Sequence, residues 1–131
     1  MTTDPISDML TRIRNANKRT HKKVIFAHSK LKEAVLKVFL DEGFIADYKV
    51  AGSGIKKEFT LKLKYGRRGV PVIRKIKRIS RPGSRIRMGY REMRPVMESQ
   101  GVLVVSTPRG VVSDNDCRVL KIGGEVICEI Y

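Results

Sequence analysis

Two short segments late in the chain carry groups that could recognise a ligand by hydrogen bonds. Ser106 and Thr107 follow the apolar run 102–105 and precede a turn at 108–110. A strand end holds side chains rigidly, so both hydroxyls can be aimed at little entropic cost, and each can donate and accept. The alternative is that they cap the turn and only stabilise it. Further on, Gly123-Gly124-Glu125 offers backbone that a ligand can approach closely and one carboxylate.

The sequence contains no combination of residues at a spacing that would indicate catalysis or metal binding. The two histidines, His21 and His28, have no nucleophile and acid at a spacing that would suggest a triad. Cys117 and Cys128 do not match a zinc signature and are expected to be small core residues. The loop at 52–54 lacks the third glycine and the following helix of a dinucleotide site. We therefore expect no enzyme activity, no cofactor and no metal.

Positive charge is the strongest bulk property of the sequence. The 131 residues include 28 Lys plus Arg and 13 Asp plus Glu, a net charge of +15. Residues 61–94 hold 13 basic side chains and 1 acidic one, a net charge of +12, whereas residues 95–131 have a net charge of −2. Such a block repels itself unless a polyanion such as nucleic acid neutralises it. We expect the block, with Arg74 and Arg78 in it, to supply mainly non-specific affinity; the alternative is a solvated basic surface.

Other locations and partners are disfavoured by what the sequence lacks. No run of 18 apolar residues occurs, so a transmembrane helix is not expected. Binding to a membrane surface would require a basic amphipathic helix, but the basic block is expected to form strands and turns. The beginning of the chain does not resemble a secretion signal, and two lone cysteines fit a reducing compartment.

The first half of the chain predicts two helices and three strands. A helix over 4–18 has Asp4 as a cap and Pro5 in its first position. A second helix begins after a Ser29 cap and ends at Gly43, with an expected buried stripe of Leu31, Ala34, Val35, Val38 and Phe39. Strands are expected at 24–27, 44–50 and 59–65, the last alternating apolar with basic residues.

The second half predicts a mostly β unit with one short helix. Residues 66–69 are the expected linker between a domain at 1–65 and one at 70–131. Strands are expected at 72–79, 102–105 and 125–131, a capped helix at 113–120, and a type II turn at 80–83. The fold class is therefore α+β: a two-helix, three-stranded N-terminal unit followed by a mostly β unit.

Blocks along the whole chain resemble the bacterial family of the eighth protein of the small ribosomal subunit. The resemblance is carried, in order, by residues 4–16 (DPISDMLTRIRNA), 29–32 (SKLK), 42–45 (EGFI), 78–83 (RISRPG), 101–112 (GVLVVSTPRGVV) and 123–128 (GGEVIC). It implies a two-part α+β protein of the cytoplasmic ribosome, monomeric within the 30S subunit. It further implies direct binding to the central domain of 16S rRNA, organisation of the platform, and contacts with the fifth and twelfth small-subunit proteins. Some members of the family also repress translation of their own operon's messenger RNA, and the resemblance leaves this activity open for the present chain.

The resemblance also suggests which residues contact RNA. The main contacts would come from Ser106, Thr107, Arg109, Gly123, Gly124 and Glu125. Supporting contacts would come from Asp4, Arg12, Arg14 and Asn15 of the first helix, from Lys30, and from Arg81, Arg85 and Arg87.

The chain departs from the family pattern at three of its positions. Pro108 stands where a third serine is common and removes a hydroxyl and an N–H. Arg87 stands where a tyrosine is common, although a guanidinium can also stack on a base. Cys117 is a conservative change in size.

Two questions stay open at the level of sequence. Glu125 could accept a hydrogen bond from a base or a 2′-hydroxyl, or it could orient nearby basic side chains; we favour the second, because an unpaired carboxylate beside phosphates is costly. The competing functions are a binder of duplex DNA and a nucleic-acid-processing enzyme. The first lacks a basic recognition helix, and the second lacks catalytic residues.

Overall fold

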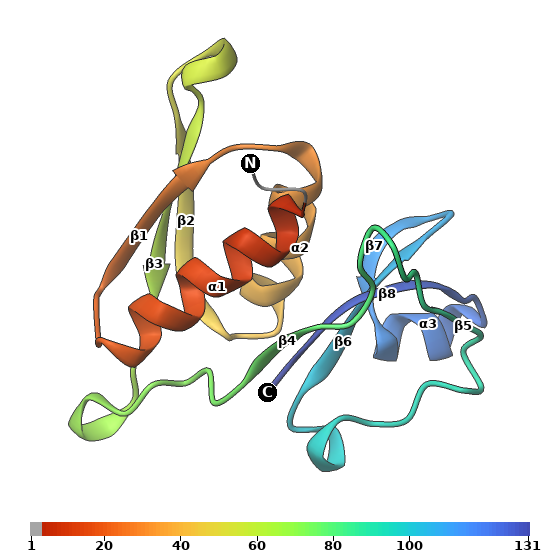
Figure 1. Cartoon of the computed structure of the whole chain (residues 1–131). Helices are drawn as coiled ribbons and strands as arrows, with labels where there is room; N and C mark the ends of the chain where they lie inside the picture. Colours follow the sequence, from red (N-terminus) through yellow and green to blue (C-terminus); the bar gives the residue numbers. More distant parts are fainter. Residues whose placement is uncertain (1–3) are drawn as a thin grey trace.

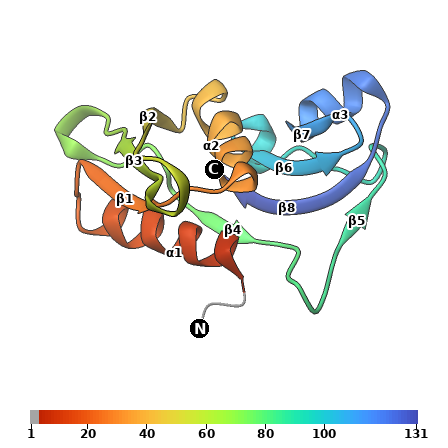
Figure 2. The ribbon, with the colours of Figure 1, turned by 90° about the horizontal axis from the view of Figure 1, so that it is seen from above.

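The computed structural model describes residues 4–131 and has the expected α+β fold. The N-terminal half contains helices α1 (Pro5–Lys18) and α2 (Lys30–Asp41) and strands β1 (Lys23–Ala27), β2 (Ile45–Ala51) and β3 (Glu58–Leu63). The strands form an antiparallel sheet in the order β1-β3-β2, beside which the helices lie (Figures 1 and 2). A short 3₁₀ turn at Gly54–Lys56 closes the β2–β3 hairpin.

The helices begin where the sequence predicts. Asp4, Ser29 and Ser113 are the N-cap residues of α1, α2 and α3 (Asp114–Leu120), and each side chain accepts a hydrogen bond from a backbone N–H three residues further on. Gly43, just past α2, has a φ of 80°, which suits a residue without a Cβ. Local capping chemistry therefore sets these helix ends.

The buried face of α2 differs from the expected one. Leu31 is 46% exposed, whereas Lys32 is only 8% exposed and donates from Nζ to the carbonyl oxygen of Ala27 at 3.1 Å. The buried positions are 32, 35, 36, 38 and 39. The expectation for Leu31 was wrong because the stripe is rotated toward the end of β1, where a lysine can satisfy a backbone carbonyl while its stem packs.

The C-terminal half forms a second antiparallel sheet. It contains β4 (Ile76–Arg78), β8 (Gly124–Ile130), β6 (Val102–Thr107) and β7 (Gly110–Ser113) in that order, and β5 (Arg87–Met88) pairs with β8 off this path. Helix α3 packs beside β6 and β7. Short 3₁₀ turns occupy Arg67–Gly69 and Met97–Ser99. Strand β8 is thus the common partner of three others.

Three expectations for this half need correction. The strand expected over 72–79 covers only Ile76–Arg78, because residues before it bond to the end of the chain instead. Strands β5 and β7 were not foreseen; both are short. The turn lies at 81–84, with mutual backbone bonds between Arg81 and Ser84, and Gly83 has no positive φ, so it is not type II.

One apolar cluster reaches from the first sheet into the second. It contains Phe39, Phe59 and Leu61 from the N-terminal half together with Ile76, Val104 and Ile130 from the C-terminal half. Polar contacts join the same two halves: Arg14 of α1 donates to the carbonyl oxygen of Ile76 at 2.7 Å, and Asn17 donates to that of Ile73 at 2.9 Å. None of the helices within residues 4–131 is both long and apolar enough to cross a bilayer.

Candidate nucleic-acid interface

The polar segments singled out in the sequence meet at one end of the second sheet. Ser106 of β6 and Arg87 of β5 are both Cα partners of Glu125 on β8, so three strands bring these residues side by side. An open depression of about 600 Å³ lies there. Its lining consists of Arg87, Met88, Gly89, Glu92, Ser106, Thr107, Pro108, Gly123, Gly124 and Glu125. We call this depression the groove.

Gly123 and Gly124 have no room for a side chain. A Cβ on Gly124 would collide with the carbonyl oxygen of Ser106, and one on Gly123 would collide with that of Met88. Both obstacles are backbone atoms, which cannot swing aside as the end of a side chain can. The paired glycines therefore let β5 and β6 approach β8 from its two sides and leave bare backbone in the groove.

The two hydroxyls have different surroundings. Thr107 Oγ1 donates to the carbonyl oxygen of Gly110 at 2.8 Å and accepts from the N–H of Arg109 at 3.1 Å, so it holds the β6–β7 turn. Within residues 4–131, the Ser106 hydroxyl makes no intramolecular hydrogen bond and lines the groove. Thr107 therefore stabilises the turn, which was the alternative role considered for both hydroxyls, whereas the Ser106 hydroxyl stays available to a ligand.

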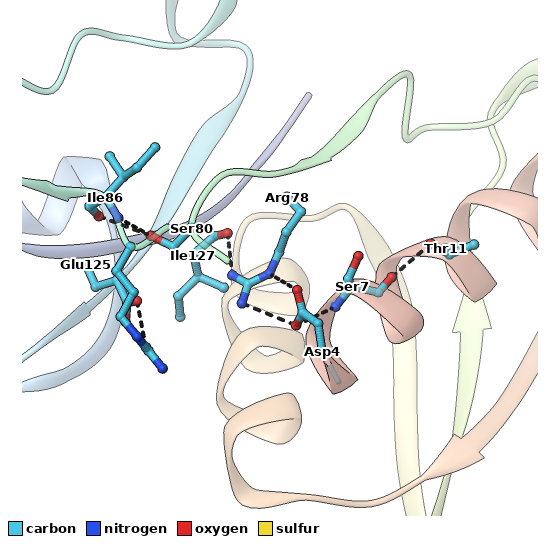
Figure 3. Close-up of polar contacts among 9 residues, drawn as sticks. Asp4, Ser7, Thr11, Arg78, Ser80, Ile86, Glu125 and Ile127 are labelled. Atoms are coloured by element: carbon cyan, nitrogen blue, oxygen red, sulfur yellow. Dashed lines mark hydrogen bonds and ion pairs between the residues drawn. The ribbon is translucent and has the colours of Figure 1, made fainter. Parts of the chain in front are cut away.

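Glu125 orients a basic side chain across the sheet. Its carboxylate accepts from Arg85 at 2.9 Å and 3.3 Å, and the pair lies beside the groove. Glu125 is labelled in Figure 3 near the Ser80 hydroxyl, which exchanges hydrogen bonds with the backbone of Ile86 and fixes this loop. A neutralised carboxylate at this position lowers the cost of bringing phosphates close.

Asp4 and Arg78 form the main polar contact between α1 and the second sheet. Arg78 donates to the Asp4 carboxylate at 3.1 Å and 3.4 Å and to the carbonyl oxygen of Ile127 at 2.8 Å (Figure 3). Only 13% of the Arg78 side chain and 16% of the Asp4 side chain are exposed. The expectation that Arg78 mainly adds non-specific affinity is therefore wrong, because its charge is used inside the protein.

The other predicted contact residues lie outside the groove. Arg109 is exposed at the turn beside it, and Arg81 is exposed at its own turn. Arg14 is engaged with Ile76, as described above, and Arg12 pairs with Asp8 at 3.1 Å on the exposed face of α1. Asn15 and Lys30 are exposed, on α1 and at the start of α2.

Sequence reasoning missed part of the groove's lining. Met88, Gly89 and Glu92 reach it only because β5 pairs with β8, and a two-residue strand leaves no periodic signal. Gly89 was the one available hint, since an isolated glycine often marks a close backbone approach. In the part of the chain that the structure describes, no three His, Cys, Asp or Glu side chains gather as a metal cluster.

A strongly basic α+β protein with an open groove of short polar side chains and bare backbone has features of a nucleic-acid-binding protein. The comparisons with known proteins agree. The family model described as ribosomal protein S8 matches residues 4–131. The chain belongs to the ribosomal protein S8 family, as the resemblance in its sequence indicated.

Curated relatives support this membership along their whole length. The small ribosomal subunit protein uS8 of Nautilia profundicola is 47% identical over 131 residues and covers 100% of both chains. The uS8 proteins of a Synechococcus strain and of Solibacter usitatus are 45% and 42% identical, with 98% and 100% of each chain covered. Membership makes the chain a structural constituent of the small subunit of cytoplasmic ribosomes.

Proposed function

We propose that this protein binds the central domain of 16S rRNA directly through the groove and helps to organise the platform of the small subunit. The observation that carries the proposal is the meeting of Ser106, the Gly123-Gly124 backbone and the Arg85–Glu125 pair on one open surface. A free hydroxyl suits a 2′-hydroxyl or a base edge, and bare backbone allows RNA to come close.

Specificity and affinity would be divided between different parts of the protein. Short hydroxyl and backbone groups discriminate, whereas phosphate contacts position a protein without reading sequence. The exposed basic side chains of residues 61–94, such as Arg74, supply the second kind of contact; Arg78 does not belong to them. Binding should therefore weaken with salt on any RNA but keep its preference for the cognate site.

Three finer parts of the proposal follow from the family resemblance. They are contacts with the fifth and twelfth small-subunit proteins, a monomeric state within the 30S subunit, and repression of the operon's own messenger through an rRNA-like hairpin. Six of the residues named for RNA contact have the strongest support because they line the groove: Arg87, Ser106, Thr107, Gly123, Gly124 and Glu125. The role of Thr107 would be to shape the turn that presents Ser106 and Arg109.

Replacing Ser106 with Ala should weaken binding to a 16S central-domain fragment about ten-fold. The lost bond leaves an RNA partner unsatisfied, which costs about 1–3 kcal/mol, while the fold loses no internal hydrogen bond. Filter binding to that fragment and to a scrambled hairpin of equal length measures the effect, with circular dichroism to confirm folding.

Ser53→Ala is the matched control, because Ser53 is an exposed serine in the β2–β3 loop and makes no capping bond. It should bind both RNAs as the unchanged protein does. Equal losses on the two RNAs for folded Ser106→Ala would contradict a role in discrimination. Equal affinity of the unchanged protein for both RNAs would contradict the proposed function itself.

A further inference from the structure

The three-stranded sheet has one face without a helix on it. Strand β3 buries Phe59, Leu61 and Leu63 toward α1 and α2, so its alternate residues point away from them. Cα pairing places these outward residues in rows across the sheet: Lys23 beside Lys62 and Asp47, then Ile25 beside Thr60 and Lys49. We call this surface, formed by residues 23, 25, 47, 49, 60 and 62, the outer face.

Positive charge on the outer face has no partner within the protein. No ion pair in the described residues 4–131 includes Lys23, Lys49 or Lys62. Two carboxylates lie on this side of the sheet. Asp47, the Cα partner of Lys62, accepts from the N–H of Tyr48 at 2.8 Å, and Glu58 lies in the next row between Ala27 and Ala51. Lys23 and Lys62 are direct cross-strand partners, and like charges at directly opposite positions destabilise a sheet.

The spacing of the lysines keeps their charges within reach of one ligand. Neighbouring strands are about 4.8 Å apart and alternate residues of a strand about 6.8 Å apart, so the three lysines lie within roughly one Debye length of each other at 0.1 M salt. A shallow depression of about 200 Å³ lies among them, lined also by Tyr48 and Thr60. The hydroxyl of Thr60 adds a neutral donor to this surface.

The chemistry of the outer face favours a phosphate backbone over a protein. Its exposed large apolar side chain is Ile25, 55% exposed, and the rest is lysine, threonine and one aspartate. Cores of protein interfaces are enriched in aromatic residues, Met and Arg and depleted of Lys. Lysines, by contrast, gain from counterion release when they neutralise phosphates.

We propose that the outer face is a second RNA-binding surface, on which Lys23, Lys49 and Lys62 hold the phosphate backbone of an RNA segment separate from the one in the groove. The proposal rests on the proposed rRNA binding. The sheet and the groove end of the molecule lie at opposite ends in both ribbon views (Figures 1 and 2). One rRNA strand segment at each end would make the protein a bridge between parts of the RNA.

Two double variants matched in charge test the proposal by its salt dependence. We compare Lys23→Gln/Lys62→Gln with Lys18→Gln/Lys37→Gln, which removes the same charge from exposed helix positions. Each variant is titrated with whole 16S rRNA and with a short central-domain fragment over a range of salt. For whole 16S rRNA, the outer-face pair should reduce the magnitude of the slope of log affinity against log salt by about 1.4 to 1.8, for two lost phosphate contacts. The control pair should change that slope by much less.

Cross-linking provides a second measurement that does not depend on affinity. A thiol placed by Ile25→Cys can carry a photo-crosslinker, because the native Cys117 and Cys128 are fully buried and burial raises the pKa of the Cys128 thiol to about 12. Ser106→Cys marks the groove, and Lys37→Cys marks an exposed helix position as the control. In small subunits reconstituted with each labelled chain, the Ile25→Cys probe should link to an rRNA segment other than that linked by the Ser106→Cys probe.

The outcomes separate this proposal from the function on which it rests. Equal salt slopes for the two lysine pairs, or Ile25→Cys cross-links to protein alone, would overturn the second surface while leaving groove binding intact. If Ser106→Ala also leaves discrimination unchanged and the Ser106→Cys probe finds no rRNA, the proposed function fails as well. A reduced slope with a distinct rRNA cross-link supports both.

Discussion

Gly124→Ala is expected to lower the free energy of unfolding by about 3 kcal/mol, the upper end for an overpacked site. The added methyl group would meet the carbonyl oxygen of Ser106, and the carbonyl carbon of Ser106 lies 2.9 Å from the same point. Strands β6 and β8 would have to separate where their pairing forms the groove. Binding to a central-domain RNA fragment should fall with the stability, and urea titration followed by circular dichroism measures the latter.

Gly83→Ala is the matched control for this substitution. A Cβ at Gly83 meets nothing within 4 Å, and its φ is negative or extended, so alanine fits there. Its stability should stay the same or rise by up to about 1 kcal/mol, through a less flexible unfolded chain. If Gly124→Ala were as stable as Gly83→Ala, the close approach of β6 to β8 would not be the reason for a glycine at 124.

Arg78→Ala is expected to cost about 3 kcal/mol of stability, as a mostly buried ion pair loses one partner. The substitution leaves the Asp4 carboxylate without its cation and removes one of two donors to the carbonyl oxygen of Ile127, which still accepts from the N–H of Ile79. Arg74→Ala is the control, because Arg74 is exposed and takes part in no ion pair among the described residues. Equal stability of the two variants in urea would contradict the structural role assigned to Arg78.

The same pair predicts an acid-dependent loss of stability. Burial raises the pKa of Asp4, but hydrogen bonds from Arg78 and Ser7 and the charge of Arg78 outweigh it, so the pKa lies below its usual 3.8. A carboxyl group whose pKa is depressed by folding stabilises the protein above its unfolded pKa. That contribution should fade as the pH drops below about 4, through the folded pKa.

Asp4→Asn isolates the charge from the cap. Asparagine can still accept the bond from the Ser7 N–H, so α1 keeps its N-cap while Arg78 loses its anion. Urea unfolding at pH 7 and below pH 4 should therefore show less acid sensitivity in Asp4→Asn and in Arg78→Ala than in the unchanged protein. The same acid sensitivity in all three would assign it to other carboxylates.

Local signals were enough to predict most of the elements. Asp4, Ser29 and Ser113 cap the helices as expected, and β3 shows the alternation of buried and exposed residues that its sequence suggests. These features depend on residues within a few positions of one another, where capping bonds and side-chain alternation act. Expectations of this kind failed where tertiary packing rotated the face of α2 toward Lys32, and at the strand over 72–79 and the turn after it.

Contacts between distant residues could not be read from the sequence. Arg78 looked like one basic residue among many, and only the arrangement of α1 against β4 brings it to Asp4. The sequence singled out Ser106, Gly123 and Gly124 of the groove. The residues that β5 adds to its lining reach it only through the pairing of β5 with β8. The different surroundings of Ser106 and Thr107 likewise could not be predicted, because only the geometry of the turn at 107–110 shows that Thr107 Oγ1 makes both of its side-chain hydrogen bonds.

The pairing of β8 with three earlier strands has a consequence for the time course of folding. Strands β2 and β3 are joined by a short hairpin, whereas Ile76 of β4 pairs with Ile130, and β5 and β6 also need β8. Contacts so distant in sequence form slowly, because the loop-closure entropy must be lost before the contacts form. The pairing of β4 with β8 thus forms after the β2–β3 hairpin, and until then the basic segment before β4 repels itself, so polyanions that screen it should speed this pairing.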